Sequence, residues 1–350
     1  MCNIESENSS RRGKYRQDAK TESRREQMGT TTAKGSKTDR MEIEKQKPPL
    51  SKKLNRIWQD RQLYLLMAIP LIFLILFSYW PMYGVLISFQ KFSPTRGVFG
   101  SQWIGWENFR RFFSTPSATR TISNTFRISL YSLIAGIPFP ILLAILLNEC
   151  RGTRYKKAVQ MITYAPYFIS TVVMVAILFQ LLDTRTGLVN VFLTRMGIGP
   201  IDFMTNKSLF RSVYVWSGIW QGTGFNAIIY ISALSAVDQE LYEAVRIDGA
   251  NRLQKIWYID LPSILPTFTI MFIMSCGSIM SVGFEKVYLM QNSANQAVSE
   301  VLSTYTYKMG LINLDYGYSS AVGMFNSVIN TIFIVLVNFI SRRVSETSLW

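Results

Sequence analysis

The chain has 350 residues, is 49% hydrophobic and carries a formal charge of +15. A basic balance can indicate nucleic-acid binding, but the charge here lies beside long apolar runs, where it sets membrane topology, so we expect no nucleic-acid partner. The sequence contains no His, which excludes His-based triads and His metal sites. Its Cys residues, Cys2, Cys150 and Cys276, are far apart and do not indicate a disulfide framework.

The first 60 residues differ in composition from the rest of the chain. They are polar, rich in Lys and Arg, and without apolar periodicity. Such a segment cannot bury enough apolar surface to offset the entropy lost on ordering, so we predict a disordered basic tail over residues 1–60. Residues 61–350 are strongly apolar with short polar loops, and we predict a single all-α integral membrane domain there.

Six segments are long and apolar enough to cross a bilayer, which takes about 20 residues for a hydrocarbon core of about 30 Å. Pro70 and Pro81 lie in the first segment and are expected to kink it or end it early. The six predicted spans are Leu63–Phe89, Phe126–Leu147, Met161–Leu182, Val213–Val237, Ile264–Met290 and Ser320–Ile340.

The distribution of Lys and Arg predicts the orientation of these spans. Residues 1–62 hold 16 of the 37 Lys and Arg, and residues 148–160 hold four more. Both segments lie on the same side if the spans alternate in direction, and basic segments favour the cytoplasm. We therefore expect a multi-pass protein of the cell membrane with both termini, and the loop at 238–263, in the cytoplasm.

The loop between the fourth and fifth spans carries helix start and stop signals. Asp238 is a suitable N-cap for a helix that runs to about Asp248, and Gly249 supplies a left-handed residue to end it. Asn251 is a suitable cap for a second short helix. We expect Leu261–Pro262 to end that second helix. One face of the first helix carries Leu241, Ala244, Val245 and Asp248, an apolar stripe with an acidic shoulder that fits a groove on a partner.

The same loop resembles the EAA loop of permease subunits from bacterial ABC importers. The matching residues are Glu243, Ala244, Asp248, Gly249, Ala250, Ile259, Leu261, Pro262 and Pro266, with Val245 in place of the family's second Ala. The resemblance implies that residues 238–266 form a cytoplasmic helix-turn-helix that couples to an ATPase subunit. An amphipathic helix packed on the membrane surface is the alternative interpretation.

The resemblance extends from about Arg61 to Trp350, where the chain is similar to LplB-type permeases of the MalF-like carbohydrate class. A Tyr stands at position 167, where the family commonly has His, and Asn292-Ser293 replaces a usual Asn-Pro. The matching motifs are Tyr79-Trp-Pro-Met-Tyr-Gly84, Ala144-Ile-Leu-Leu-Asn-Glu149, Tyr164-Ala-Pro-Tyr-Phe-Ile-Ser170, Gly283-Phe-Glu-Lys-Val-Tyr-Leu289 and Ala321-Val-Gly-Met-Phe-Asn326.

This resemblance implies the type I ABC importer permease fold with six transmembrane helices. It implies a heterodimer with a second, homologous permease, two cytoplasmic ATP-binding subunits, and an extracellular lipoprotein that delivers a sugar or oligosaccharide. The chain has no GxxxxGK[ST] phosphate loop. We therefore expect no enzymatic activity and no cofactor on this chain, with ATP and Mg²⁺ bound by the partner ATPase.

Polar and aromatic side chains within the spans are candidates for the substrate pathway, because polar groups in a membrane are costly. Amides can hydrogen-bond sugar hydroxyls, and aromatic rings can stack on sugar rings. Hydrogen bonding between helices is the open alternative. The candidates are Trp220, Gln221, Asn226 and Tyr230 in the fourth span and Asn326 and Asn330 in the sixth.

Glu285 is a further candidate at the far end of the fifth span. If that span is one helix from Pro266, Glu285 lies about 28 Å along it, near the outer interface. Glu285 and its neighbour Lys286 either line the outer mouth of the pathway or reach the interface or a salt bridge with an outer loop.

Three other classes of function stay open at this point. A secondary transporter or channel would need coupling-ion residues near the midplane or an inverted repeat, but midplane charges are few and no such repeat is visible. An importer for peptides or amino acids would carry the same EAA loop. A sensory or scaffold membrane protein would leave the loop match unexplained.

Overall fold

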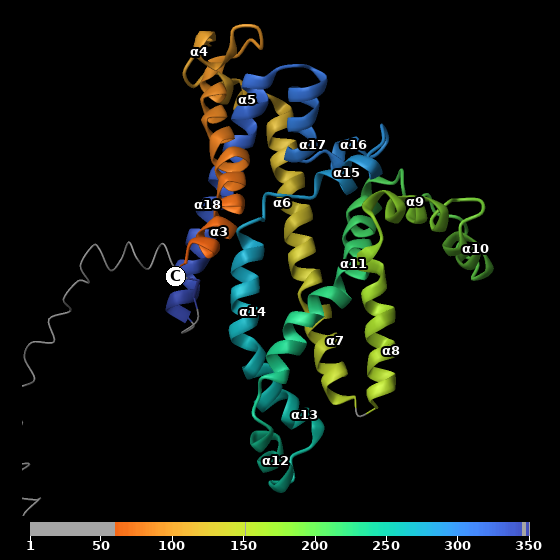
Figure 1. Ribbon diagram of the computed structural model, residues 1–350. Coiled ribbons are helices and arrows are strands. Elements are labelled where there is room, and N and C mark those ends of the chain that lie inside the picture. The colour runs from red at the N-terminus through yellow and green to blue at the C-terminus, as the bar shows by residue number, and fades with distance from the viewer. Residues whose placement is uncertain (1–59, 151, 345–347, 350) are drawn as a thin grey trace, which may run out of the picture. The chain divides into compact units, whose positions relative to one another are not determined.

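The computed structural model describes residues 60–150, 152–344 and 348–349. The predicted disordered tail lies, except for Asp60, outside the described residues. The described chain is mainly helical (Figure 1) and divides into two units, with the boundary between Trp80 and Pro81.

The described part of the first unit is helical. It consists of α3 (Arg61–Leu74) and a π-helical turn, η1 (Ile75–Tyr79), after which the 3-10 helix η2 (Trp80–Phe89) begins. Pro70 lies inside α3 and does not end it. Just before Pro81 the helix widens to a π-helical turn, and from Trp80 it tightens to a 3-10 helix. Such changes of helix type accommodate proline, which has no N–H to donate to the helical ladder.

The second unit contains the remaining elements. Two short strands, β1 (Gln90–Lys91) and β2 (Gln102–Trp103), pair antiparallel with Gln90 opposite Trp103. The helices up to residue 195 are α4 (Gly97–Gly100), α5 (Glu107–Ser114), α6 (Pro116–Gly136), α7 (Pro138–Glu149), α8 (Thr153–Tyr164), η3 (Ala165–Phe168), α9 (Thr171–Leu181) and α10 (Leu188–Arg195). The later helices are α11 (Lys207–Ser235), α12 (Gln239–Ile247), α13 (Arg252–Lys255), η4 (Ile256–Asp260), α14 (Leu261–Cys276), α15 (Phe284–Met290), α16 (Gln296–Ser299), α17 (Leu302–Tyr307), η5 (Lys308–Ile312) and α18 (Tyr316–Val344).

Helix α11 lies at the centre of the bundle and contacts α6, α7, α8 and α14. Ala227 and Leu234 of α11 pack with Ala144 of α7 and Ile264 of α14 in one buried cluster. Gly224 lies directly against the carbonyl of Thr163 on α8, where any Cβ would clash with backbone. A glycine at this position therefore permits the close approach of α8 and α11.

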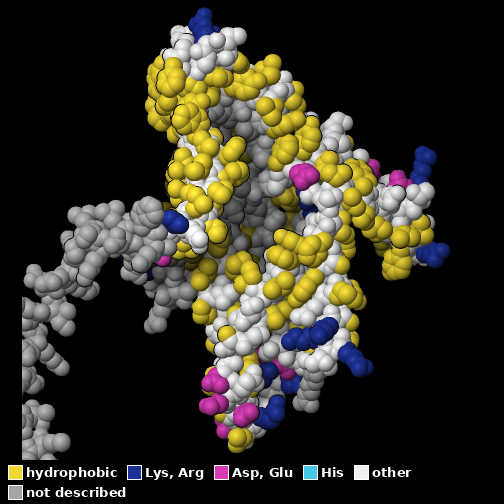
Figure 2. Space-filling view, in the orientation of Figure 1, with side chains coloured by type: hydrophobic (Ala, Val, Ile, Leu, Met, Phe, Trp, Pro, Cys, Tyr) yellow, Lys and Arg dark blue, Asp and Glu magenta, His cyan; other side chains and the backbone are white. Residues whose placement is uncertain are grey.

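Helices lie in all six predicted spans, but only some of the described helices are both long enough and apolar enough to cross a membrane. Four do so: Arg61–Phe89, Pro116–Glu149, Arg252–Cys276 and Tyr316–Arg343; the bent pair Thr153–Phe168 and Thr171–Leu181 makes five. Helix α11 has 29 residues but is less apolar, because it carries Gln221, Asn226 and several Gly and Ser. Hydrophobic side chains dominate the visible face of the helices (Figure 2), as expected for a multi-pass membrane protein.

The third predicted span is not one straight helix. The chain bends by 101° between Phe168 and Thr171. Pro166 cannot donate to a helical ladder, and Ser170 starts the next helix by accepting a hydrogen bond from the N–H of Val173. The amide of Gln221 donates to the carbonyl of Ile169 at 2.9 Å, which satisfies a backbone group that the bend leaves free.

The prediction of one continuous fifth span over residues 264–290 is wrong. Helix α14 ends at Cys276, and residues 277–283 form a non-helical segment before α15. Asn330 of α18 stabilises that segment, because it accepts from the N–H of Met280 at 2.9 Å and donates to the hydroxyl of Ser281 at 2.8 Å. The depth estimate for Glu285 assumed an unbroken helix, so its position near the outer interface stays a prediction.

The expected helix stop at Leu261–Pro262 is also wrong. The helix that begins at Arg252 runs without interruption to Cys276. A π-helical turn at Ile256–Asp260 directly precedes Pro262, and its wider backbone leaves room for a proline ring that would clash in a regular α-helix.

Candidate coupling loop and transport cavity

The loop after α11 is shaped by local hydrogen bonds. The Asp238 side chain accepts from the N–H of Glu240 at 3.1 Å and caps α12. Gly249 has φ +74°, and the N–H of Ala250 reaches back to the carbonyl of Val245 at 3.1 Å. This is a glycine-terminated helix end, as the sequence predicted. The backbone N–H of Asn251 and its side chain both bond Gln254, which forms a capping box for α13.

The loop exposes apolar side chains at one end of the molecule. The exposed fractions are 85% for Ile247, 77% for Leu253 and 68% for Trp257. Glu243, Ala244 and Asp248 are exposed, whereas Val245 and Ala250 are half-buried. Acidic side chains gather on the tip formed by α12 (Figure 2). Leu261 and Pro262 lie outside this tip, at the start of α14.

A partly buried ionic cluster anchors the loop to the end of α7. Lys255 forms an ion pair with Glu149 of α7, and its Nζ lies 3.7 Å from Asp260 Oδ2. The Asp260 side chain is fully buried and accepts from the Tyr242 hydroxyl at 2.8 Å and from the Asn148 amide at 3.4 Å. Three helices thus meet on one buried carboxylate, which makes a rigid link between the loop and the bundle.

Burial and the hydrogen bond to Asp260 raise the pKa of Tyr242 to about 12. Because the folded-state pKa lies above the ordinary value of about 10, the hydroxyl donates throughout the physiological range. Its contribution to stability is complete below pH 10 and is lost as the pH rises through 12.

A polar groove lies beside the cluster. It has a volume of about 490 Å³ and is lined by Gln239 and Tyr242 of α12, by Asn251 and by Glu149, among others. Arg246 and Arg252 also line the groove. Together with Glu149 they give the groove charges of both signs. A groove flanked by exposed apolar side chains is a surface suited to binding another protein.

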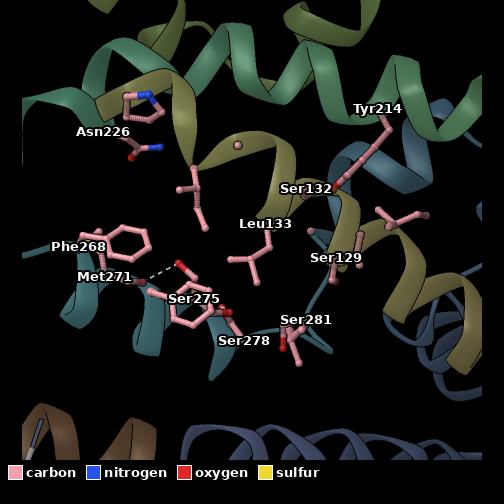
Figure 3. A pocket seen from close by; sticks show the side chains of 18 of the residues that line it. Ser129, Ser132, Leu133, Tyr214, Asn226, Phe268, Met271, Ser275, Ser278 and Ser281 are labelled. Atoms are coloured by element: carbon pink, nitrogen blue, oxygen red, sulfur yellow. Dashed lines mark hydrogen bonds between the residues drawn. The ribbon is translucent and has the colours of Figure 1, made fainter. Parts of the chain in front are cut away.

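A second site is a cavity inside the bundle, of about 370 Å³ (Figure 3). Its walls come from α6, α7, α11, α14 and the segment after α14. An adjoining cavity of about 320 Å³ shares Ser132, Tyr214 and Asn226 with it. The hydroxyl groups that line the larger of the two cavities belong to Ser129, Ser132, Ser275, Ser278, Ser281, Tyr214 and Tyr230.

The structure brings only part of the predicted pathway residues to this cavity. Asn226 and Tyr230 line it, and Gln221 lines the adjoining cavity. Trp220 lies in two other pockets, together with Trp216. The roles proposed for these residues stay predictions.

The other three candidates lie elsewhere. Asn330 is engaged in hydrogen bonds to Met280 and Ser281. The side-chain oxygen of Asn326 is buried and has no hydrogen-bond partner among the described residues. Glu285 is exposed on α15.

Sequence reasoning considered Lys286, the residue next to Glu285, only at the outer interface and did not select it as a candidate for this cavity. Lys286 lines the adjoining cavity, as do Tyr214 and Ser132. The signal was present, because Lys286 is a charged residue within an apolar run. Counting along an unbroken helix placed it near the membrane surface and hid its relation to α11.

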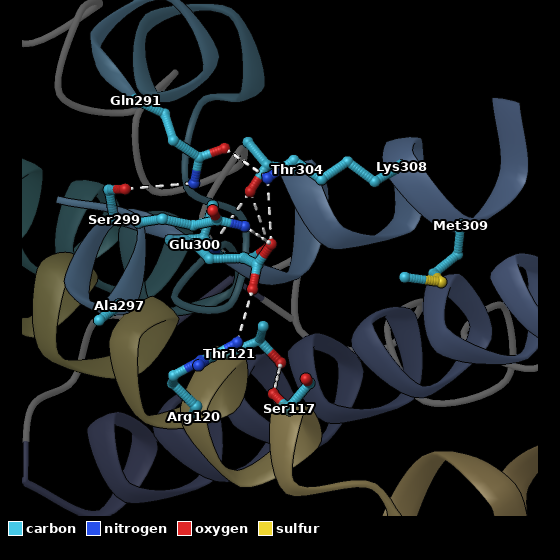
Figure 4. Close-up of polar contacts among 12 residues, drawn as sticks. Ser117, Arg120, Thr121, Gln291, Ala297, Ser299, Glu300, Thr304, Lys308 and Met309 are labelled. Atoms are coloured by element: carbon cyan, nitrogen blue, oxygen red, sulfur yellow. Dashed lines mark hydrogen bonds and ion pairs between the residues drawn. The ribbon is translucent and has the colours of Figure 1, made fainter. Parts of the chain in front are cut away.

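A second ionic cluster, far from the loop, is fully paired (Figure 4). Glu300, whose side chain is 5% exposed, forms ion pairs of 3.1 Å with Arg120 of α6 and with Lys308. Gln296 also donates to its carboxylate, at 3.2 Å, and Gln291 accepts from Lys308 at 2.7 Å. This cluster ties α6 to the segment around α16 and α17 and leaves none of its three charges unpaired.

Taken together, the fold is that of a multi-pass helical membrane protein with a capped helix-turn-helix at one end of the second unit and, within the bundle, a cavity lined by apolar and hydroxyl-bearing side chains. A family model described as "Binding-protein-dependent transport system inner membrane component" matches residues 136–346. The chain belongs to this family of ABC transporter permeases.

Curated relatives and solved structures agree with that assignment. The chain is 39% identical to protein LplB of Bacillus subtilis over 83% of this chain and 92% of the relative. It is 37% identical to the polygalacturonan/rhamnogalacturonan transport system permease protein YteP of Bacillus subtilis, over 92% of this chain and all of the relative (100%). A chain from the crystal structure of a bacterial alginate ABC transporter, in complex with an alginate pentasaccharide-bound periplasmic protein, is 34% identical, with a TM-score of 0.78 over 84% of this chain and 99% of that chain.

Proposed function

We propose that this chain is the transmembrane permease subunit of an ATP-driven importer for a sugar or oligosaccharide. The observation that carries the proposal is the pairing of two sites on one family fold: a cavity lined by hydroxyl and amide groups, and a rigid loop with an exposed apolar surface. Hydroxyl, amide and aromatic groups are the side chains that recognise sugars. The relatives support the substrate class, because YteP is named as a permease for polygalacturonan and rhamnogalacturonan and the solved transporter is named for alginate.

The loop is proposed to couple this chain to a separate ATPase. Exposed Ile247 and Leu253 would enter a groove on that subunit, and Glu243 would meet a basic group there. Gly249 sets the turn between the two helices of the loop. The Lys255–Glu149 pair and Asp260 would pass movement of the ATPase to α7 and α14, because they hold all three segments together.

The proposed assembly contains a second, homologous permease, two ATP-binding subunits and an extracellular solute-binding lipoprotein. ATP and Mg²⁺ bind to the ATPase, and no cofactor is assigned to this chain. Both termini and the loop are proposed to face the cytoplasm, on the strength of the Lys and Arg distribution. Orientation and coupling support each other, since ATP is available on that side.

Reconstitution of the four components in proteoliposomes tests the proposal. The measurement is the accumulation of a labelled oligosaccharide in the vesicles. ATP is supplied either inside or outside the vesicles, and in each case the binding protein is added on the side opposite to ATP. We expect uptake only when both the ATPase with ATP and the binding protein are present on opposite sides. Uptake that persists without ATP and instead follows an ion gradient would identify a secondary transporter.

A further inference from the structure

Lys286 is a cation that lines a cavity and has no carboxylate partner in the part of the chain that the structure describes. Its ammonium donates to the backbone carbonyl of Tyr214 at 3.0 Å and lies 4.8 Å from the centre of the Tyr214 ring. It lines the cavity that adjoins the main one. Gly218 makes room for it, because a Cβ at that position would come within 3.3 Å of the Lys286 nitrogen.

The charges around Lys286 do not neutralise it. Among the described residues, no ion pair involves Lys286, and the carbonyl of Tyr214 accepts only one of its three N–H groups. Glu300 is already paired with Arg120 and Lys308. The lining of both cavities contains no Asp or Glu. The remaining donors of Lys286 are therefore available to a molecule inside the cavity.

An unpaired cation inside a membrane protein is costly. A negatively charged solute offsets that cost, because a charge-assisted hydrogen bond to a carboxylate is stronger than one between neutral groups. The other lining groups, Ser132, Asn226 and Tyr214, are uncharged and can bond hydroxyls. One cation among hydroxyl and amide groups matches a sugar that carries one carboxylate per ring.

We propose that Lys286 binds the carboxylate of a uronic-acid residue during passage, so that the pathway selects acidic over neutral oligosaccharides. This inference rests on the proposed function. Lys286 acts as a specificity-determining residue, and Asn226 and Ser132 contact the hydroxyl groups of the same sugar ring. A neutral sugar would leave the ammonium unpaired and gain nothing from it.

The test uses the complete transporter in proteoliposomes, with labelled trigalacturonate and its methyl ester as probes. The two probes have the same rings and differ in charge. The binding of each probe to the solute-binding protein is measured first, and uptake is expressed per loaded binding protein. The variants are Lys286→Gln, Lys286→Arg and, as a matched control, Lys207→Gln, which removes an exposed Lys at the start of α11.

We expect Lys286→Gln to lower the ratio of acid uptake to ester uptake about tenfold. A change of this size corresponds to the loss of one hydrogen bond to a charged group. Lys286→Arg and Lys207→Gln should keep the ratio. Equal loss of both uptakes, or of complex assembly, in Lys286→Gln would assign Lys286 a structural role and overturn the inference. If the wild type takes up neither probe nor any other oligosaccharide, the proposed function itself fails.

A second measurement needs the acidic probe alone. A Lys286→Cys variant, with Cys2, Cys150 and Cys276 replaced by Ser, is treated with a thiol reagent that adds either an aminoethyl group or a methyl group. We expect the cationic aminoethyl group to restore uptake of trigalacturonate and the methyl group not to. Equal recovery, or none, with the two reagents contradicts a role for the charge.

Discussion

The loop end and the cavity of this permease handle charge in opposite ways. At the loop end, Lys255 is paired with Glu149 and lies beside Asp260, while large apolar side chains such as Ile247 are exposed. The cavity lining combines apolar side chains with hydroxyl and amide groups, and Lys286, which forms no ion pair among the described residues, lines the adjoining cavity. A surface with exposed apolar groups suits a protein partner, whereas a cavity lined by hydroxyl and amide groups and by a cation suits a polar solute.

This difference has a consequence for mutations. Changes at the loop end should weaken the contact with the ATPase and leave sugar recognition unchanged. Changes at the cavity should alter sugar passage and leave the ATPase bound. The two effects separate only if the sites act through different partners.

The largest effect is expected for Gly249→Val. Gly249 has φ +74°, and a β-branched residue in this region costs about 1–3 kcal/mol. The turn between the two loop helices would be lost, and we expect ATP-dependent uptake to fall about tenfold or more, together with co-purification of the ATPase.

Gly197→Val is the matched control. Gly197 also ends a helix, with φ +78° and the same pair of backbone hydrogen bonds, but it follows α10 and not α12. Both variants carry the same kind of backbone strain, but only Gly249 lies in the loop. The ATPase should therefore stay bound in Gly197→Val. Equal loss in both variants would mean that strain alone, and not the loop, explains the result.

Removal of the buried carboxylate in Asp260→Ala should give the next largest effect. Asp260 is fully buried and accepts from Tyr242 and Asn148, which would be left without their acceptor. We expect a loss of about 2 kcal/mol, seen as a fall of about 5 °C in the Tm of the purified complex. Tyr242→Phe removes one of these bonds and should lower the Tm by less; an unchanged Tm in both variants contradicts the anchoring role.

A smaller effect is expected at the cavity side for Gln221→Leu. The side chain of Gln221 satisfies the carbonyl of Ile169 at the bend between α8 and α9. Hydrogen bonds between membrane helices contribute about 0.6 kcal/mol on average. We expect uptake to fall about twofold to threefold with the ATPase fully retained, and loss of the ATPase in this variant would erase the distinction between the two regions.

The smallest effect is expected for Glu243→Ala. Glu243 is exposed on α12, and exposed ion pairs contribute little because water and salt screen them. Uptake should fall about twofold at low salt and less at high salt, when measured in the proteoliposome assay. A salt-independent tenfold loss would show that Glu243 is buried against its partner in the complex.

The sequence predicted the first helix of the loop, the turn after it and the start of the second helix, because their structure depends on local signals. Asp238 and Asn251 cap the helices, and Gly249 ends the first one, each through bonds to residues within five positions. The bend after Phe168 and the break after Cys276 were not predicted. They lie within segments that are apolar enough to be taken as continuous spans, and the groups that stabilise them, Gln221 and Asn330, come from distant helices.

The cavity was predicted only in part for the same reason. Asn226 and Tyr230 share a helix that is apolar on the whole, so their polarity marked them in the sequence. Lys286 reaches the cavity only because the fifth span breaks at Cys276, and no local signal reveals the direction of the chain after that break.

Site-directed photo-crosslinking tests the account most directly. A photoreactive residue replaces Ile247, which is 85% exposed on the loop, or Phe99, which is 95% exposed on α4 at the other end of the second unit (Figure 1). In membranes that contain the complete transporter, we predict a cross-link from position 247 to the ATP-binding subunit and none from position 99. A cross-link to lipid alone at position 247, with uptake intact, would contradict the assignment of this loop as the coupling site.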